Sequence, residues 1–570
     1  MKAFEEYKER LLSYLHVEQE MEQKDIEALK QMSREEKIEA GIMLTDLKVI
    51  KSYDDTCLLH VPDNYSKLRS GDKVVLSNQI DDIKIKALVV DVTSDTITIT
   101  SDKELDTKGD YDLEVASPNL LASLIGCLEG ILPATPGAAF LRMLCGEETV
   151  EAESFLKIDP KGLYGYEKIY SKLNSEQKKA IASILEFYPI NILQGPPGTG
   201  KTVVLAGAAI ATSLKNREVV IIANTHQAVN NALNKINALD KNIPLIKIGE
   251  LLKADGLNES VIKFPKFSDY NDYSRKNRKK KKYGYVVGMT IWGAIAHLGL
   301  RIHSHFRPYL ALIDEASLLP LTYASVLGKF ASSICFMGDS RQMPPIFRTE
   351  LESNALSESI LDYCTKNVRG VPINILPETH RMNREITQIV SKAFYEAHGI
   401  VLRSAESVAD NKYESPYFES IGLTDSIAFI NSDLSSPNCK EENEGEANTV
   451  IELVKKLLDE GHSPNDLAIV TPFRKHVRLL RGKAYESIKQ EDCPLIDTVE
   501  RLQGQDVNCI ILTFASSDED YIEKRKEFLF NLNRLNVMIS RAKTKVVIFG
   551  CENVQTRLKG IISDYKMDIK

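Results

Sequence analysis

The 570-residue sequence has few of the features that mark metal-cluster, membrane-spanning or secreted proteins. Its nine cysteines stand singly and no two form a C-x-x-C pair, so zinc and iron–sulfur clusters are not expected. No apolar run reaches the roughly 18 residues of a membrane span, and the charged start, 1–6, has no apolar signal-peptide core. We therefore expect a cytoplasmic protein, or a nuclear one in a eukaryote, with no membrane partner.

The charge balance is acidic, with a formal net charge of −8. A nucleic-acid partner would therefore be held by a local basic groove and not by a globally positive surface. At roughly 100–200 residues per domain, the length predicts three or four domains.

Composition changes along the chain and predicts five segments. Phe4, Tyr7, Leu11, Tyr14 and Leu15 recur at helical spacing, and several short β-rich stretches follow after Gly41. Beyond residue 165, apolar strands alternate with helices twice, which is typical of α/β proteins with parallel sheets. The expected segments are stalk helices over 1–42, a small antiparallel barrel over 43–118, returning helices over 119–165, and parallel α/β domains over 166–370 and 371–570.

The clearest motif fits G-x-x-x-x-G-K-[ST], the phosphate-binding loop of nucleoside triphosphatases. An apolar strand, 190–194, precedes it and an apolar helix, 203–214, follows it, which is the context that the motif requires. Backbone N–H groups of such a loop surround phosphates, while its lysine reaches the terminal phosphates and its hydroxyl binds Mg²⁺. The loop consists of Gly195, Pro196, Pro197, Gly198, Thr199, Gly200, Lys201 and Thr202.

An acid pair, Asp314 and Glu315, follows the apolar stretch 309–313. An acid at the carboxyl end of a parallel strand points into the ligand crevice. Asp314 is therefore the candidate for holding Mg²⁺, and Glu315 for orienting or deprotonating a water. The alternative is an ordinary acid pair at a helix start, which the phosphate loop about 110 residues upstream makes less attractive.

Two glutamines and two arginine motifs complete the candidates. Gln342 follows a third apolar strand and can sense a γ-phosphate, or it lies in a plain proline-rich turn. Gln177 can pair with an adenine edge, although Asn174 or Ser175, just before it, could simply be a helix cap. Arg381 and Arg541, in the second α/β half, are candidates for arginine fingers, or for surface salt bridges.

In order and spacing these motifs resemble those of superfamily 1 helicases, in the 5′→3′ branch called 1B. The chain is most similar to the helicase half of the eukaryotic helicase–nucleases that process DNA flaps, without a segment like their nuclease domain or cysteine cluster. The likeness covers nearly the whole chain. It rests on the loop and acid pair together with 224–231, 288–290, 338–345, 380–383, 470–474, 498–506 and 534–543.

The resemblance implies two RecA-like parallel-sheet domains of the P-loop NTPase class, with a helical stalk and a β-barrel subdomain. It implies ATP and Mg²⁺ as cofactors, hydrolysis coupled to movement on single-stranded nucleic acid, and a monomeric protein. DNA is favoured over RNA because the nearest likeness is a DNA enzyme. Gln177 would contact adenine. The γ-phosphate region would be contacted by Gln342, Arg381 and Arg541. Asp506, where many relatives have Glu, would contact the nucleotide. The strand would be lined by Thr225, His226, Thr290, Thr471, Pro472 and Thr498.

Some alternatives stay open at this point. The insert 251–285 is shorter than in relatives and contains a run, 275–282, with seven basic residues in eight. The run either grips phosphates at a duplex fork or forms a solvated loop. An RNA helicase and an ATP-driven translocase or remodeller without unwinding remain alternatives. A non-catalytic scaffold is disfavoured because the catalytic residue types are all present.

Overall fold

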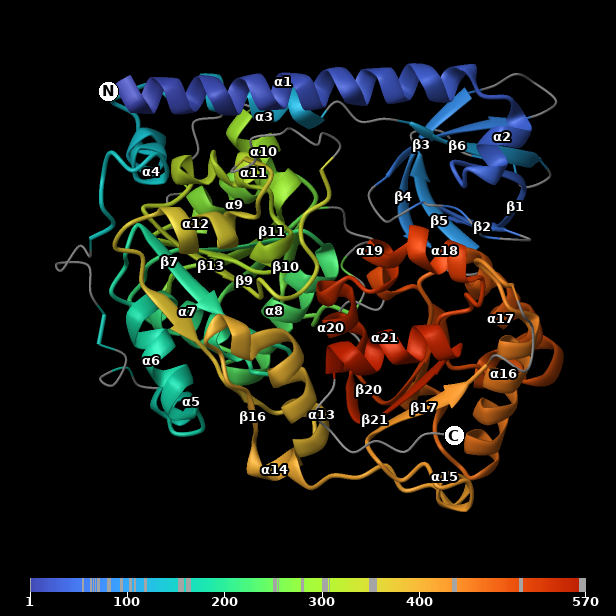
Figure 1. Ribbon diagram of the computed structural model, residues 1–570. Coiled ribbons are helices and arrows are strands. Elements are labelled where there is room, and N and C mark those ends of the chain that lie inside the picture. The colour runs from blue at the N-terminus through green and yellow to red at the C-terminus, as the bar shows by residue number, and fades with distance from the viewer. Residues whose placement is uncertain are drawn as a thin grey trace.

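The computed structural model places a helical stalk and a barrel above two α/β lobes (Figure 1). We call the unit built on the sheet β7–β14 the first lobe, and the unit built on β17–β21 the second lobe. The structure describes residues 2–53, 56–61, 64, 66, 68, 72–78, 84–92, 96–101, 105–106, 109–116, 120–151, 158–159, 163, 166–249, 254, 256–277, 281–299, 306, 308–347, 356–432, 438–501 and 506–562.

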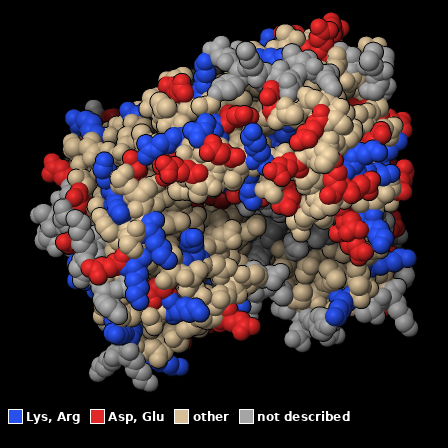
Figure 2. All heavy atoms as spheres, turned by 90° about the horizontal axis from the view of Figure 1, so that it is seen from below, with Lys and Arg blue, Asp and Glu red and all other residues tan. Residues whose placement is uncertain are grey.

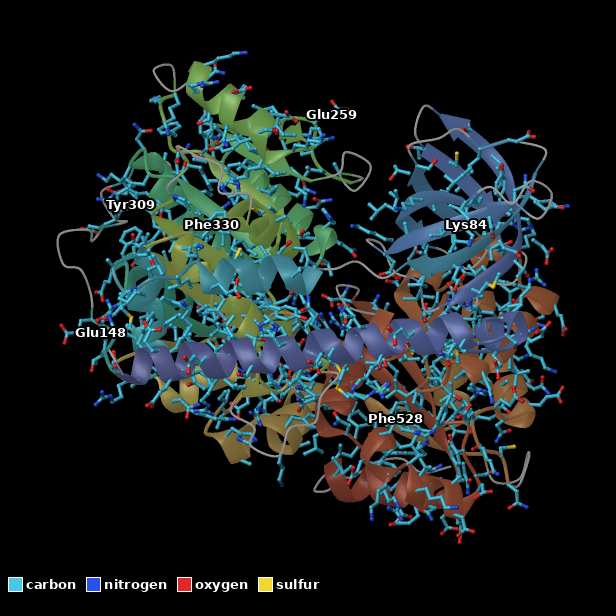
Figure 3. All side chains as sticks on the ribbon, turned by 90° about the horizontal axis from the view of Figure 1, so that it is seen from above. Lys84, Glu148, Glu259, Tyr309, Phe330 and Phe528 are labelled. Atoms are coloured by element: carbon cyan, nitrogen blue, oxygen red, sulfur yellow. The ribbon has the colours of Figure 1, made fainter. Side chains whose placement is uncertain are left out.

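The stalk is dominated by helix α1 (Lys2–Gln31), which runs along the top of the molecule from the first lobe to the barrel (Figures 1 and 3). The helically spaced residues from Phe4 to Leu15 are buried against α3 (Leu120–Glu129) and α4 (Pro136–Leu144), as their period requires. Beyond the far end of α1, helix α2 (Arg34–Glu39) is linked to the barrel by ion pairs from Arg34 to Asp112 and from Lys37 to Glu114.

In the described residues, six antiparallel strands close into the expected barrel in the order β1-β2-β5-β4-β3-β6. Alternate residues of these strands point inward, so one face of each strand builds the barrel core. The strands are β1 (Met43–Tyr53), β2 (Thr56–His60), β3 (Lys73–Asn78), β4 (Lys84–Val92), β5 (Thr96–Ser101) and β6 (Asp110–Ala116).

The first lobe is a parallel sheet in the order β10-β9-β11-β8-β12-β13-β7-β14. Its central strands are buried throughout because helices cover both faces, which explains their continuous apolar sequences. The strands are β7 (Ile190–Gln194), β8 (Val219–Ala223), β9 (Leu245–Ile248), β10 (Ile262–Phe264), β11 (Val286–Thr290), β12 (Leu310–Ile313), β13 (Ser333–Gly338) and β14 (Ile373–Ile375). The helices are α5 (Tyr166–Tyr170), α6 (Ser175–Ile184), α7 (Lys201–Leu214), α8 (His226–Leu239), α9 (Phe267–Asn277), α10 (Ile291–Gly299), α11 (Leu321–Ala324) and α12 (Ile360–Asn367).

Strand β14 lies beyond residue 370, where the sequence places the boundary between the lobes. It nevertheless pairs with β7, Ile373 opposite Ile192, so the chain leaves the first sheet only after Ile375. A two-stranded sheet of β15 (Glu378–Thr379) and β16 (Arg403–Ser404) follows.

The second lobe has a parallel sheet in the order β17-β21-β20-β18-β19. Its strands are β17 (Ile427–Asn431), β18 (Leu467–Val470), β19 (Leu495–Asp497), β20 (Val507–Thr513) and β21 (Ala542–Gly550). Its helices are α13 (Arg384–Val390), α14 (Glu406–Ala409), α15 (Pro416–Ser420), α16 (Glu444–Asp459), α17 (Arg474–Ser487), α18 (Glu519–Lys524), α19 (Lys526–Leu529), α20 (Leu532–Ser540) and α21 (Glu552–Ile562). The expected α/β class with a barrel and parallel sheets is thus confirmed.

The barrel lies beside the second lobe, with β2 and β5 next to α18 in Figure 1 and with Lys84 and Phe528 on the same side of the molecule in Figure 3. Arg474 Nη1, at the start of α17, donates a 3.2 Å hydrogen bond to the Ser66 carbonyl oxygen of the barrel. Over the part of the chain that the structure describes, no helix is both long and apolar enough to span a bilayer.

Candidate nucleotide site and strand path

The phosphate-binding loop connects the carboxyl end of β7 to the start of α7. Gly198 and Gly200 have φ values of +74° and +86°, a region that side chains disfavour. A Cβ on Gly198 would lie 2.5 Å from Arg381 Cβ, and one on Gly200 2.6 Å from Gln177 Nε2. Both positions therefore require glycine, for conformation and for space.

The rest of the loop is held by its own polar groups. Thr199 Oγ1 donates 2.8 Å to the Pro196 carbonyl, and the Lys201 ammonium is bonded to the carbonyls of Gly195 and Pro196. Burial lowers the pKa of Lys201, while Asp339 and Asp314 act against this shift. The lysine is thus turned onto its own loop, where its contacts are exchangeable for phosphate oxygens.

The acid pair lies at the carboxyl end of β12, as the sequence predicts. Glu315 has a φ of +55°, a strained conformation for a residue with a side chain, and its N–H donates 2.9 Å to Asp314 Oδ1. Burial, and then the charge of Asp314, raise the pKa of Glu315 to about 7. Burial raises the pKa of Asp314 as well, against the opposing charge of Lys201. A carboxyl group that titrates near neutral pH suits a general base.

Gln177 is buried beneath the loop, and both ends of its amide are engaged. Its Oε1 accepts from the Asn174 N–H at 3.2 Å and its Nε2 donates to the Thr199 carbonyl at 3.2 Å, while Asn174 Oδ1 caps α6. This is a capping box that also braces the phosphate loop. Adenine recognition by Gln177 would require it to exchange these bonds.

The segment that enters the second lobe contacts the loop directly. The His380 N–H donates 2.9 Å to the Gly198 carbonyl, and Thr379 Oγ1 donates 2.8 Å to the Pro197 carbonyl. Sequence reasoning missed Thr379, and its position directly before His380-Arg381 was the available signal. These bonds fix Arg381 beside the loop.

The two candidate arginines come together with Asp506 at the same place. Asp506 Oδ1 lies 2.7 Å from Arg381 Nη2 and 3.6 Å from Arg541 Nη1, and Arg381 Nη1 donates 3.0 Å to the Ser540 carbonyl. Burial lowers the pKa of Arg541 to about 10, with the charge of Arg381 adding to the effect. The positive charge of Arg541 opposes the rise in the Glu315 pKa, which places this arginine in the field of the acid pair.

Gln342 lies on the loop after β13, with its Nε2 donating 2.9 Å to Asp339 Oδ2. The loop is therefore tied to the Asp339 carboxylate, which also acts on the charge of Lys201. The structure thus brings the predicted residues of three strand ends and two arginine motifs to one place.

The residues expected to line a strand lie at the carboxyl edges of both sheets. Thr225 follows β8, Thr290 ends β11, Thr471 follows β18 and Thr498 follows β19. His226 packs against Gly249, where a Cβ would lie 2.9 Å from the ring, and Pro472 is buried beside Thr471. The Thr225 hydroxyl caps α8, and Thr290 Oγ1 accepts from the Gly293 N–H at 3.3 Å. The hydroxyl groups of Thr225 and Thr290 therefore shape the turns at the edge of the first sheet.

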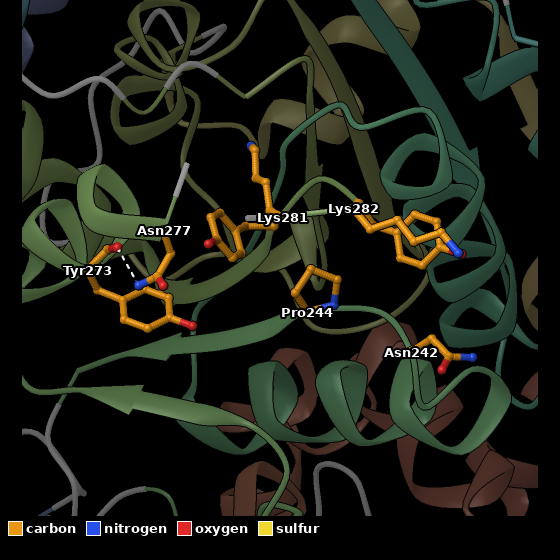
Figure 4. A pocket seen from close by; sticks show the side chains of 8 residues that line it. Asn242, Pro244, Tyr273, Asn277, Lys281 and Lys282 are labelled. Carbon is orange, nitrogen blue, oxygen red and sulfur yellow. Dashed lines mark hydrogen bonds between the residues drawn. The ribbon is translucent and has the colours of Figure 1, made fainter. Parts of the chain in front are cut away.

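The basic run lies elsewhere. Residues 278–280 are outside the described part of the chain, but Lys281 and Lys282 lie before the amino end of β11, whereas Thr290 lies at its carboxyl end. Lys281 is paired with Glu218 at 2.9 Å, and Lys282 lies 5.1 Å from the centre of the Tyr283 ring. Both lysines line an open cavity of about 580 Å³ together with Asn242 and Tyr273 (Figure 4). The described lysines are thus on the edge of the sheet opposite to the strand-contact residues.

The surface carries charges of both signs. On the face in Figure 2, basic and acidic side chains are interspersed and the surface is hollowed near its middle. Charges of both signs are mixed on this face and the net charge is −8. An anionic partner would therefore be held by a local group of basic residues and not by the overall charge of the protein.

The loop and its neighbours fit a nucleoside triphosphate with Mg²⁺. Glu315 Oε2 and Arg381 Nε are buried and have no hydrogen-bond partner among the described residues. Thr202 and Asp314 supply the hard oxygen ligands that Mg²⁺ prefers.

Comparison with known proteins agrees with this geometry. Two family models match, each described as an AAA domain, over residues 172–360 and 356–553. Among curated proteins, the chain is 26% identical to the DNA replication ATP-dependent helicase/nuclease JHS1 of Arabidopsis thaliana, over 94% of this chain and 40% of that protein. It is 25% identical to DNA2 of Homo sapiens, over 67% of this chain and 37% of that protein, and 27% identical to dna2 of Schizosaccharomyces pombe, over 66% and 28%. The chain spans 40% or less of the length of these relatives.

Solved structures are more distant. The Arterivirus nonstructural protein 10 (helicase) is 11% identical and covers 94% of this chain and 83% of that one, with a TM-score of 0.42. Its complex with DNA is 10% identical, covers 87% and 78%, and has a TM-score of 0.39. These likenesses are too weak to add to the sequence relationship. The chain is therefore homologous to part of the DNA replication ATP-dependent helicase/nucleases, and two of its segments match AAA domain models.

Proposed function

We propose that the chain is an ATP- and Mg²⁺-dependent helicase that moves 5′→3′ on single-stranded nucleic acid, with DNA as its track. The names of its relatives support the activity and the choice of DNA, since each is called a DNA replication helicase/nuclease. The direction rests on the resemblance to the 1B branch.

One observation carries this proposal. The phosphate loop belongs to the first lobe, while Arg381 and Arg541 approach it from the second, and His380 and Thr379 bond directly to the loop. A nucleotide held at such a site contacts both lobes, so its hydrolysis changes the contact between them. A phosphate loop in a single-lobed kinase would leave these arginines unexplained.

The residues at the site have distinct tasks in hydrolysis. Lys201 exchanges its bonds to the loop carbonyls for phosphate oxygens, and Glu315 orients the attacking water and accepts its proton. Arg381 and Arg541 stabilise charge on the transferred phosphoryl group, and Gln342 responds to its presence. Mg²⁺, held by Thr202 and Asp314, would neutralise phosphate charge when bound.

The same geometry supports the proposed strand path. The carboxyl edges of the two sheets carry Thr225 and Thr290 on one lobe and Thr471 and Thr498 on the other. Opening and closing of the lobes would change the spacing between these contacts, and alternating grip on the strand then gives directional steps. Contacts to the strand backbone make such movement tolerant of sequence.

Two substitutions test the hydrolytic site. Glu315→Gln removes the base but keeps its shape, so we expect the strand-stimulated ATPase rate to fall by about 10²–10⁴-fold while ATP binding is retained. Lys201→Ala should lose ATP binding. Lys215→Ala, at the exposed end of α7, is the control and should match the unsubstituted protein. Full activity in either site variant would contradict the assignment.

The track and the direction need separate measurements. ATPase rates with matched single-stranded DNA and RNA identify the track, and we expect the larger stimulation by DNA. Forked duplexes with only a 5′ or only a 3′ single-stranded tail identify the direction, and unwinding should require the 5′ tail. Stimulation by RNA alone would make the chain an RNA helicase, and ATPase without unwinding a translocase.

A further inference from the structure

A buried carboxylate lies at the centre of a hydrogen-bond network beside Gln342. Asp339 is 1% exposed and accepts four hydrogen bonds. Its Oδ1 accepts from Gln194 Nε2 at 2.7 Å and from the Arg341 N–H at 3.1 Å, and its Oδ2 accepts from Gln342 Nε2 at 2.9 Å and from the Tyr395 hydroxyl at 2.6 Å. Three of these donors belong to the first lobe, and Tyr395 belongs to the second.

A second residue of the second lobe joins the network. Asn536 Nδ2, on α20, donates 2.8 Å to the Tyr395 hydroxyl oxygen and 2.7 Å to the Arg341 carbonyl. Both Tyr395 and Asn536 are fully buried. The loop that carries Gln342 is therefore held from the other lobe by two side chains from separate elements.

The backbone near Tyr395 is unusual. Residues Ser391–Tyr395 form a π-helical turn that directly continues α13. Such turns are rare and frequently lie at functional sites. Here the residue at the end of the turn reaches into the first lobe.

The two anchors lie on the elements that carry the arginines. Asn536 is on α20, which ends directly before Arg541, and Tyr395 ends the helical segment that begins at Arg384, just after Arg381. The bond from Arg381 to the Ser540 carbonyl links these elements again. A displacement of the Gln342 loop is thus connected through rigid helices to both arginines.

Packing alone does not account for this arrangement. Polar groups cost free energy when buried, and an apolar core of the same shape would hold the lobes together as well. The network instead surrounds the side chain best placed to respond to a γ-phosphate, and it crosses the boundary between the lobes.

We propose that Tyr395 and Asn536 are positioning residues that couple Gln342 of the first lobe to Arg381 and Arg541 of the second. This inference rests on the proposed function. Loss of the γ-phosphate releases Gln342, the Asp339 network rearranges, and the two arginine-bearing elements move with it. Neither residue touches the nucleotide, so ATP affinity is set elsewhere.

Tyr395→Phe removes a single hydroxyl group and tests the coupling. We expect strand-stimulated kcat to fall at least tenfold while KM for ATP changes less than twofold, and less duplex to be unwound per ATP hydrolysed. Asn536→Leu should change kcat, KM and unwinding per ATP in the same way. Because the two residues act as a unit, the double variant should be no slower than the slower single variant. Tyr413→Phe is the control, since the Tyr413 hydroxyl has no hydrogen-bond partner among the described residues.

The possible outcomes separate this inference from the function on which it rests. An active unsubstituted protein with unchanged kcat and unwinding per ATP in Tyr395→Phe overturns the inference and leaves the function intact. The inference is also overturned if the variant loses activity only in proportion to its loss of folded protein, as measured by a thermal melt. Absence of ATPase in the unsubstituted protein overturns the function itself. Should Tyr395→Phe fail to fold, Asn536→Leu carries the same expectation.

Discussion

At the scale of single residues, Asp506 decides how the second-lobe arginines are held. One of its carboxylate oxygens, Oδ1, lies 2.7 Å from Arg381 and 3.6 Å from Arg541. The negative charge of Asp506 therefore allows the two positively charged guanidinium groups to lie side by side. Phosphate oxygens must compete with this carboxylate for the same guanidinium groups. This geometry predicts that Asp506 competes with the nucleotide, whereas the resemblance to helicases implies a direct nucleotide contact.

Asp506→Asn separates these two roles. A competing carboxylate predicts a KM for ATP that falls severalfold, because the arginines become free for phosphate, while Asp506→Glu, which keeps the charge, stays near the original value. Steady-state ATPase titrations measure this directly. A rise of KM in Asp506→Asn would show that Asp506 instead binds the nucleotide.

Other residues show how much of the site can be predicted from the sequence. Lys201 and Glu315 could be predicted because each follows an apolar strand within a fixed pattern, and the fold gathers the carboxyl ends of parallel strands. The bond from Gln177 to Thr199 could not, since it depends on how α6 lies against the loop. Tyr395 sits in an apolar helical pattern, and its partner Asp339 lies 56 residues earlier in the other lobe. No local signal marks such a pair.

At the scale of elements, α17 is anchored to the second sheet by a buried histidine. His476 Nδ1 accepts from the Asn443 N–H at 3.4 Å, and its Nε2 lies 2.9 Å from Thr513 Oγ1, which is bonded to the buried Glu446. Burial lowers the pKa of His476 to about 3. The folded protein therefore keeps this histidine neutral.

This pKa predicts a pH dependence of stability. Because the unfolded chain binds a proton near pH 6.5 and the folded chain does not, the stabilisation is complete above that pH and is lost as the pH falls. Between pH 7 and 5.5 the loss is about 1 kcal/mol. Urea unfolding of the second lobe at the two pH values measures it, with His476→Gln as the control that lacks this contribution. Equal pH dependence in both proteins would show that the fold does not lower the pKa of His476.

Some helices and strands can be predicted from the sequence better than others. Long apolar strands and the amphipathic α1 follow from periodicity. The two-residue strands β15 and β16 have no period to read, and β14 joins the first sheet only through its pairing with β7. Both features depend on pairing between segments that are not neighbours in the sequence.

At the scale of the whole molecule, the stalk and the barrel extend the first lobe over the second. Helix α1 packs on the first lobe with its first half, and its far end leads to the barrel (Figures 1 and 3). The barrel in turn reaches α17 through the bond from Arg474 to Ser66. Because Arg474 follows Thr471 and Pro472 in sequence, the barrel lies next to the second-lobe part of the proposed strand path.

The central claim is that one nucleotide site is shared between two lobes, and substitution of a single arginine tests it most directly. Arg541 lies on the second lobe, yet we expect Arg541→Ala to reduce the strand-stimulated ATPase rate by about 10³-fold or more, with ATP binding measured separately and retained. Arg557→Ala, which removes a surface arginine paired with Glu523 on the same lobe, should leave the rate unchanged. An Arg541→Ala protein that hydrolyses ATP at the unsubstituted rate would contradict the shared site.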